Sequence, residues 1–131
     1  MLRSASVTAN IPASDIERAK SFYADTFGLE PATEVGDGGM LIYRTDGGTV
    51  FSLYQTEYAG QAGHTIAQFH VDDVVGEARA LQAKGVSLET YDMPGVEWED
   101  GVADMGGMGQ AAWFKDSEGN ILCIDSGFPQ D

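Results

Sequence analysis

Apolar and polar residues alternate at the start of the chain. From Ser4 to Ile11 every second residue is apolar, a period that predicts a β-strand with one face against apolar material. Pro12 is expected to end this strand, because proline cannot donate to a β-ladder.

A helix is predicted directly after this strand. Ser14 or Asp15 supplies its N-cap, and Glu17 follows Ser14 at the spacing of a capping box. Gly28 is expected to close the helix as a left-handed C-cap. The apolar residues that recur at helical spacing are Ile16, Ala19, Phe22, Tyr23 and Phe27.

The same order of elements then occurs a second time. Three strands are predicted at residues 31–35, 40–45 and 48–55, the last two joined by the turn Asp46-Gly47-Gly48. A new strand follows at 64–71, with a helix capped by Asp72 or Asp73 and closed by Gly85. The final strands are predicted at 86–91, 111–115 and 121–125. This repetition indicates one α+β domain, residues 1–131, with a first module at about 4–56 and a second at about 63–126.

A pocket follows from the predicted geometry. A helix covers one face of each sheet, so the opposite faces must look at each other or at a partner chain. Those faces are too polar for a dry core and suit a ligand cavity, the alternative being a solvated sheet face without a ligand. Counting by twos, the open faces carry Ser6, Thr8, Asn10, Val50, Ser52, Tyr54, His64, Ile66, Gln68, His70, Ile121, Cys123 and Asp125.

Composition excludes several classes of partner. Seven Lys and Arg against 21 Asp and Glu give a net charge of −14, which repels nucleic acid and anionic membrane surfaces. The single cysteine fits a reducing compartment. Residues 1–12 do not resemble a signal peptide and no stretch is long enough to span a membrane, so a cytoplasmic protein is expected.

Three segments resemble the vicinal oxygen chelate superfamily, which includes glyoxalase I, extradiol dioxygenases, and fosfomycin- and bleomycin-resistance proteins. They read NIPASDIERAKSFYADTFGLEP, HTIAQFHVDDVVGEARALQAKGV and AAWFKDSEGNILCID. The last is close to the family ending Phe-x-Asp-Pro-Asp-Gly-Asn, with Ser117 at the proline position. The resemblance implies the glyoxalase/bleomycin-resistance fold, in which two βαβββ modules form curved mixed sheets around a cavity, usually in a homodimer.

The resemblance also locates the metal ligands of the metal-dependent members. Those four positions fall on Ser6, Ser52, His64 and Cys123, where the family usually has His, Glu or Gln, His and Glu. Only His64 matches, and serine hydroxyls are weak ligands for divalent ions. We therefore expect no metal and no cofactor.

Other residues offer ligand contacts or chemistry. His64 is a candidate general base or hydrogen-bond donor, the alternative being a histidine that only bonds nearby backbone. Cys123 is expected to be inert. Residues 92–110 show neither helical nor strand period, which is typical of a lid, a dimer contact or a solvated loop. Tyr54, Trp98 and Trp113 are candidate aromatic walls, although the face that Trp113 takes is open.

Two functions remain. The first is a small-molecule-binding protein with a metal-free cavity that sequesters or carries a partly apolar organic ligand, as bleomycin-resistance members do. The second is a glyoxalase-type lyase, isomerase or dioxygenase, either metal-dependent or with His64 as general base. The first is favoured because three of the four expected metal ligands are missing.

Overall fold

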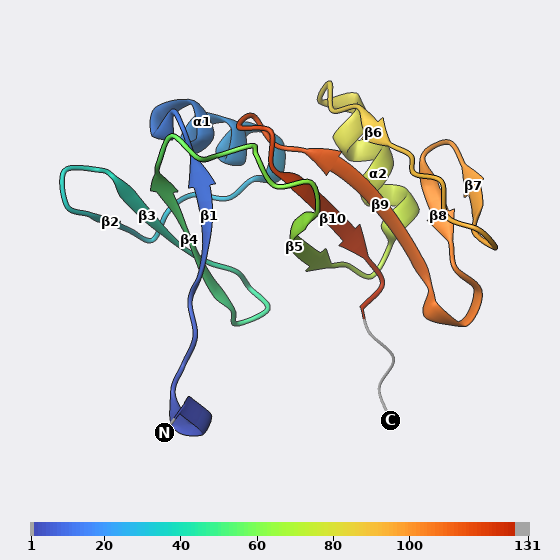
Figure 1. Ribbon diagram of the computed structural model, residues 1–131, viewed down its shortest axis with the longest axis horizontal. Helices are drawn as coiled ribbons and strands as arrows, with labels where there is room; N and C mark the ends of the chain where they lie inside the picture. The colour runs from blue at the N-terminus through green and yellow to red at the C-terminus, as the bar shows by residue number, and fades with distance from the viewer. Residues whose placement is uncertain (1, 128–131) are drawn as a thin grey trace.

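Two sheets, each covered by one helix, form the molecule (Figure 1). The computed structural model describes residues 2–127, so the two ends of the predicted domain, residue 1 and residues 128–131, lie outside it. The first sheet has the order β1-β4-β3-β2, with β1 parallel to β4. Its elements follow a short 3-10 helix and are β1 (Ala9–Ala13), α1 (Ile16–Phe27), β2 (Thr33–Val35), β3 (Met40–Arg44) and β4 (Val50–Gln55).

The second sheet has six strands in the order β5-β10-β9-β8-β7, with β6 paired to β9. Its elements are β5 (Thr65–His70), α2 (Val74–Ala83), β6 (Leu88–Glu89), β7 (Glu97–Glu99), β8 (Val102–Asp104), β9 (Gln110–Lys115) and β10 (Ile121–Asp125). The predicted α+β class is confirmed. The strand–helix–three-strand order holds in the first module, whereas five strands follow α2 in the second. Neither helix, in the part of the chain that is described, is long and apolar enough to cross a bilayer.

The expectation that residues 92–110 lack regular structure was wrong, because this segment contains a β-hairpin that widens the second sheet. Strands β7 and β8 pair around the two-residue turn Asp100-Gly101, and both turn residues have positive φ, 49° and 84°. Positive φ at both positions is the signature of the tight turns that connect twisted hairpin strands. Each strand is only three residues long, which is too short for a period of two to stand out in the sequence.

The first strand also differs from its prediction. It covers Ala9–Ala13 instead of residues 4–11, and Pro12 lies inside it. Proline is tolerated there because β1 is the edge strand of its sheet and hydrogen-bonds only to β4. Residues 2–8 precede the strand and are exposed.

The predicted capping residues Asp15, Gly28 and Asp73 lie at the helix ends. The carboxylate of Asp15 accepts a hydrogen bond from the Arg18 amide at the start of α1, and Gly28 closes the helix at φ 70°. Asp73 caps α2 in the same way. The capping box between Ser14 and Glu17 does not form, since the Ser14 hydroxyl bonds to Glu118 instead.

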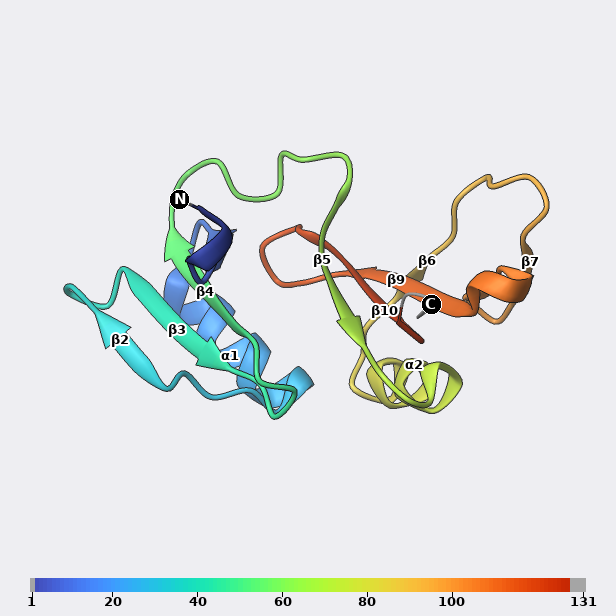
Figure 2. The ribbon, with the colours of Figure 1, turned by 90° about the horizontal axis from the view of Figure 1, so that it is seen from below.

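The two helices lie on the same side of their sheets (Figure 2). The helix-free faces of both sheets therefore point to the other side of the molecule and not at each other. The sequence left open whether the two helix-free faces look at each other or at a partner chain. Within this chain they do not look at each other.

Aromatic side chains join the two modules on the helix side. The ring of Phe27, at the end of α1, lies 6.1 Å from Phe69 of β5 and 5.8 Å from Phe114 of β9. Phe51 of β4 also contacts Phe69, at 6.1 Å. One apolar core thus runs through both modules.

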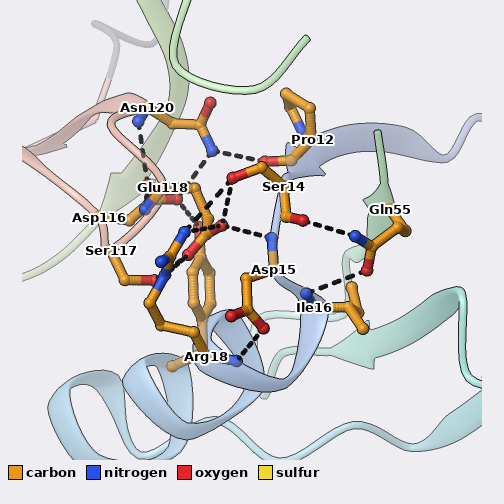
Figure 3. A network of polar contacts seen from close by, with 11 residues as sticks. Pro12, Ser14, Asp15, Ile16, Arg18, Gln55, Asp116, Ser117, Glu118 and Asn120 are labelled. Carbon is orange, nitrogen blue, oxygen red and sulfur yellow. Dashed lines mark hydrogen bonds and ion pairs between the residues drawn. The ribbon is translucent and has the colours of Figure 1, made fainter. Parts of the chain in front are cut away.

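A buried carboxylate makes the polar junction between the modules (Figure 3). Glu118, in the turn between β9 and β10, has a fully buried side chain. It accepts hydrogen bonds from the Asp15 amide at 2.9 Å, the Arg18 guanidinium at 2.8 and 3.0 Å, and the hydroxyls of Ser14 and Ser117. The turn therefore supplies an anion to the N-terminus of α1, where unpaired amides favour negative charge.

The same turn holds a second buried carboxylate. Asp116 accepts from the hydroxyl of Tyr23 at 2.7 Å and from the side-chain amide of Asn120 at 3.0 Å. The Asn120 amide also donates to the Pro12 carbonyl at 2.8 Å. The turn between β9 and β10 is thereby fixed to β1 and α1 of the other module.

Replacing Glu118 tests this junction. Burial alone would raise the pKa of Glu118, but hydrogen bonds from Arg18, Asp15 and Ser117 outweigh it and lower the pKa to about 2. Because this lies below the ordinary value of 4.5, the stabilisation is complete above that value and is lost as the pH falls toward 2. We expect Glu118→Gln to lower the free energy of unfolding at neutral pH by about 2 kcal/mol.

Denaturant unfolding measured across the acid range checks this expectation. The gap between wild type and Glu118→Gln should narrow as the pH falls from about 5 to about 2. The exposed Glu57→Gln is the control and should change little. An equal gap at every pH would contradict the account.

Two buried tyrosines provide a matched pair. Both side chains are fully buried, but the Tyr23 hydroxyl bonds to Asp116, whereas the Tyr43 hydroxyl has no hydrogen-bond partner among the described residues. Tyr23→Phe should lower the free energy of unfolding by about 1–2 kcal/mol, and Tyr43→Phe should leave it unchanged or raise it. Thermal or denaturant unfolding measures both, and equal losses in the two variants would refute this interpretation.

Candidate functional site

Strand register brings three of the candidate residues side by side on the helix-free face of the second sheet. Cys123 of β10 lies opposite Gln68 of β5 on one side and opposite Trp113 of β9 on the other. Side chains directly opposite one another point to the same face of a sheet. We call this surface, with the residues that contact it below, the open face of the second sheet.

Aromatic rings gather on this face around Trp113. The Trp113 ring lies 5.9 Å from Tyr91 in an edge-to-face arrangement and 6.0 Å from Trp98. The indole Nε1 donates to the Thr65 hydroxyl at 3.1 Å, which fixes the ring. The question left open by the sequence is settled, because Trp113 faces the open side.

Tyr91 is a site residue that the sequence analysis missed. It follows Glu89, which lies opposite Trp113 in the pairing of β6 with β9. Two residues on from Glu89, the same alternation would have placed Tyr91 on the open face. The predicted strand at 86–91 contained this signal, although only Leu88–Glu89 are paired.

Asp125 organises the polar side chains at the end of β5. Its buried carboxylate accepts from the Gln68 amide at 3.1 Å and lies 2.5 Å from the His70 Nδ1. The backbone amide of Gly127 adds a third hydrogen bond, at 2.9 Å. The positions of Gln68 and His70 are thus fixed by one carboxylate.

Cys123 lies beside Trp113 in the sheet and is completely buried. Burial raises the pKa of its thiol to about 12, the Asp125 charge adds to this rise, and hydrogen bonds from the Ala112 amide and Gln68 offset it only in part. At neutral pH the side chain is a protonated thiol, which is a poor nucleophile and a poor metal ligand. It contributes packing.

A second group of candidates lies on the first sheet. Asn10 and Ser52 are register partners, and the Ser52 hydroxyl donates to the Asn10 side-chain oxygen. Tyr54, two residues further along β4, is 38% exposed. Ser6 and Thr8 precede β1 in the exposed segment and are not on a strand.

The four positions that correspond to family metal ligands do not form a site. Ser6 lies on the exposed segment, Ser52 bonds to Asn10, Cys123 is a buried thiol, and His64 is exposed and precedes β5. Within residues 2–127 no three His, Cys, Asp or Glu side chains are grouped so that they could hold a metal ion. The donor set of this chain does not fit a divalent cation at these positions.

The family follows from a direct comparison. A model of the Glyoxalase/Bleomycin resistance protein/Dioxygenase superfamily matches residues 5–124. The chain belongs to this superfamily. A search of curated proteins gives no match.

Solved structures of the superfamily share the fold at low sequence identity. The bleomycin resistance determinant encoded on transposon Tn5 is 17% identical, with a TM-score of 0.68 over 95% of this chain and 98% of that one. TnmS3, an antibiotic binding protein from Streptomyces sp. CB03234, is 22% identical, with a TM-score of 0.62 over 93% and 96%. The fosfomycin resistance protein FosX from Listeria monocytogenes, complexed with Mn(II) and sulfate, is 16% identical, with a TM-score of 0.67 over 95% and 90%.

Proposed function

We propose that this protein binds a partly apolar organic molecule on the open face of the second sheet. The side chains of this face make the contacts, and no metal ion takes part. The observation that carries the proposal is the cluster of Tyr91, Trp98 and Trp113 beside the polar side chains of Gln68 and Asp125. Aromatic walls with a few fixed polar groups are the usual composition of a small-molecule site.

The negative charge of the protein limits which ligands can bind at the open face. The chain carries a net charge of −14, and both Glu89 and Asp125 lie on the open face by strand register. Lys115 lies 3.7 Å from Glu89 and offsets part of its charge. This balance favours a neutral or cationic ligand over an anionic one.

We further propose that a second copy of the chain completes the site. Within one chain the two open faces point to the same side (Figure 2), so the face of the first sheet, which carries the exposed Asn10 and Tyr54, does not close over the open face of the second. The first sheet of a partner could supply them, which is consistent with the homodimer expected from the resemblance. Sedimentation equilibrium should then give about twice the monomer mass of 14.0 kDa.

Catalysis of the glyoxalase type receives less support. That chemistry needs a bound cation to polarise the substrate oxygens, and the corresponding positions do not assemble ligands. His64, the alternative general base, is exposed and lies before β5, away from the hydrogen bonds that fix Gln68 and His70. Binding is also what the name of one structural neighbour describes, the antibiotic binding protein TnmS3.

Intrinsic fluorescence tests the proposal, because the only two tryptophans of the chain are both in the proposed site. Titration with bleomycin, and with neutral and cationic aromatic compounds, should quench or shift the emission for at least one compound. Trp113→Leu should weaken that binding about tenfold or more, since stacked aromatic contacts contribute strongly to such sites.

Tyr58→Leu is the matched control, because Tyr58 is an exposed aromatic residue outside the site. This variant should bind the ligand as tightly as wild type does. The proposal fails if a ligand binds equally well to wild type and to Trp113→Leu. It also fails if binding requires an added divalent cation.

A further inference from the structure

A cleft of about 690 Å³ lies between the two modules, apart from the aromatic cluster. Its two long sides are the facing edges of the sheets, β1 and β5, which do not pair with each other. The end of α1 and the outer surface of α2 close it on the helix side through Thr26, Glu77 and Ala80. The volume falls within the range of ordinary small-molecule sites, about 300–1,000 Å³.

The floor of the cleft is apolar because the module junction is made of side chains. Phe27, Phe51 and Phe69 line it and are the same rings that join the modules at 6.1 Å. If β1 and β5 were paired through their backbones, this space would be closed. Because aromatic side chains join the modules instead, a gap remains between the two strands, and apolar side chains line it.

Polar groups also line the cleft, and two of them are held in place. Gln68 and His70 line the cleft, and the buried Asp125 carboxylate fixes both. The Gln68 amide nitrogen has two N–H groups, which donate to Asp125 and to Cys123, so the group that Gln68 can offer a ligand is its carbonyl oxygen, an acceptor. That oxygen suits a hydroxyl or N–H donor on the bound molecule.

The charges around the cleft exclude an anionic ligand. No Lys or Arg is among the described residues that line it, whereas Glu77 is. A carboxylate or phosphate group buried there would have no counter-charge, which is strongly unfavourable in an apolar site.

We propose that the cleft between the modules is a second binding site, for an uncharged and largely apolar organic molecule that carries a hydroxyl or N–H donor. The cleft shares Gln68 with the open face of the second sheet, but Tyr91, Trp98 and Trp113 are not among its lining residues. It does not depend on the function proposed for that face.

Two fluorescent probes with the same ring system test the proposal. N-phenyl-1-naphthylamine is neutral and has an N–H donor, and 1-anilinonaphthalene-8-sulfonate adds a sulfonate. The intact protein should bind the neutral probe, seen as a rise in probe emission, at least about tenfold more tightly than the sulfonate. Comparable binding of both probes, or binding of neither, would overturn the proposal.

Two exposed alanines of α2 give a matched pair of variants. Ala80 lines the cleft and Ala83, one turn later, does not. Ala80→Trp should fill the cleft and weaken binding of the neutral probe about tenfold, whereas Ala83→Trp should bind as wild type does. Thr49→Trp, on the opposite wall, is a second blocking variant should Ala80→Trp fail to fold by circular dichroism.

Trp113→Leu separates this proposal from the proposed function. Loss of neutral-probe binding in Trp113→Leu, with normal binding in both cleft variants, would place the probe on the open face and refute the cleft site. Loss of neutral-probe binding in Ala80→Trp and Thr49→Trp supports the cleft site, whatever the outcome in Trp113→Leu.

Discussion

The Glu118 carboxylate connects the two modules, and the relative placement of the turn between β9 and β10 and the start of α1 depends on it. It lies in the last turn of the second module, but it accepts hydrogen bonds at the N-terminus of α1 in the first module, about 100 residues earlier in the chain. A buried carboxylate is unfavourable unless hydrogen bonds compensate its lost hydration. Here Ser14, Asp15, Arg18 and Ser117 provide them, so the turn can occupy only the position where α1 begins.

This junction explains the exposed surfaces of the molecule. With the turn fixed to α1, both helices lie on the same side, and the aromatic rings of the core fill the space between the modules. The sheet edges β1 and β5 stay unpaired with each other, which leaves the cleft. The helix-free faces point the other way, and the Trp113 cluster lies on one of them. The cleft is therefore a consequence of how the modules are joined, whereas the Trp113 cluster is built within the second module.

Much of the fold could be predicted from the sequence, because strong periodicity and capping residues act locally. Asp15, Gly28 and Asp73 mark helix ends through their own backbone or nearest amides. Counting by twos worked inside β4, β5 and β10, where Ser52, Gln68 and Cys123 take the expected face. It failed at Ser6 and Thr8, because the strand starts later than the alternation does. The role of Glu118 could not be predicted, since a turn residue gives no local sign of a partner 100 positions away.

The central claim is that the open face binds its ligand without a metal ion. Isothermal titration calorimetry of the purified protein with Zn²⁺, Mn²⁺ and Ni²⁺, after elemental analysis for metal already bound, tests it most directly. The account predicts no stoichiometric binding, because Ser6, Ser52, His64 and Cys123 do not assemble a donor set. Tight one-to-one binding of any of these ions that is abolished by His64→Ala would contradict it.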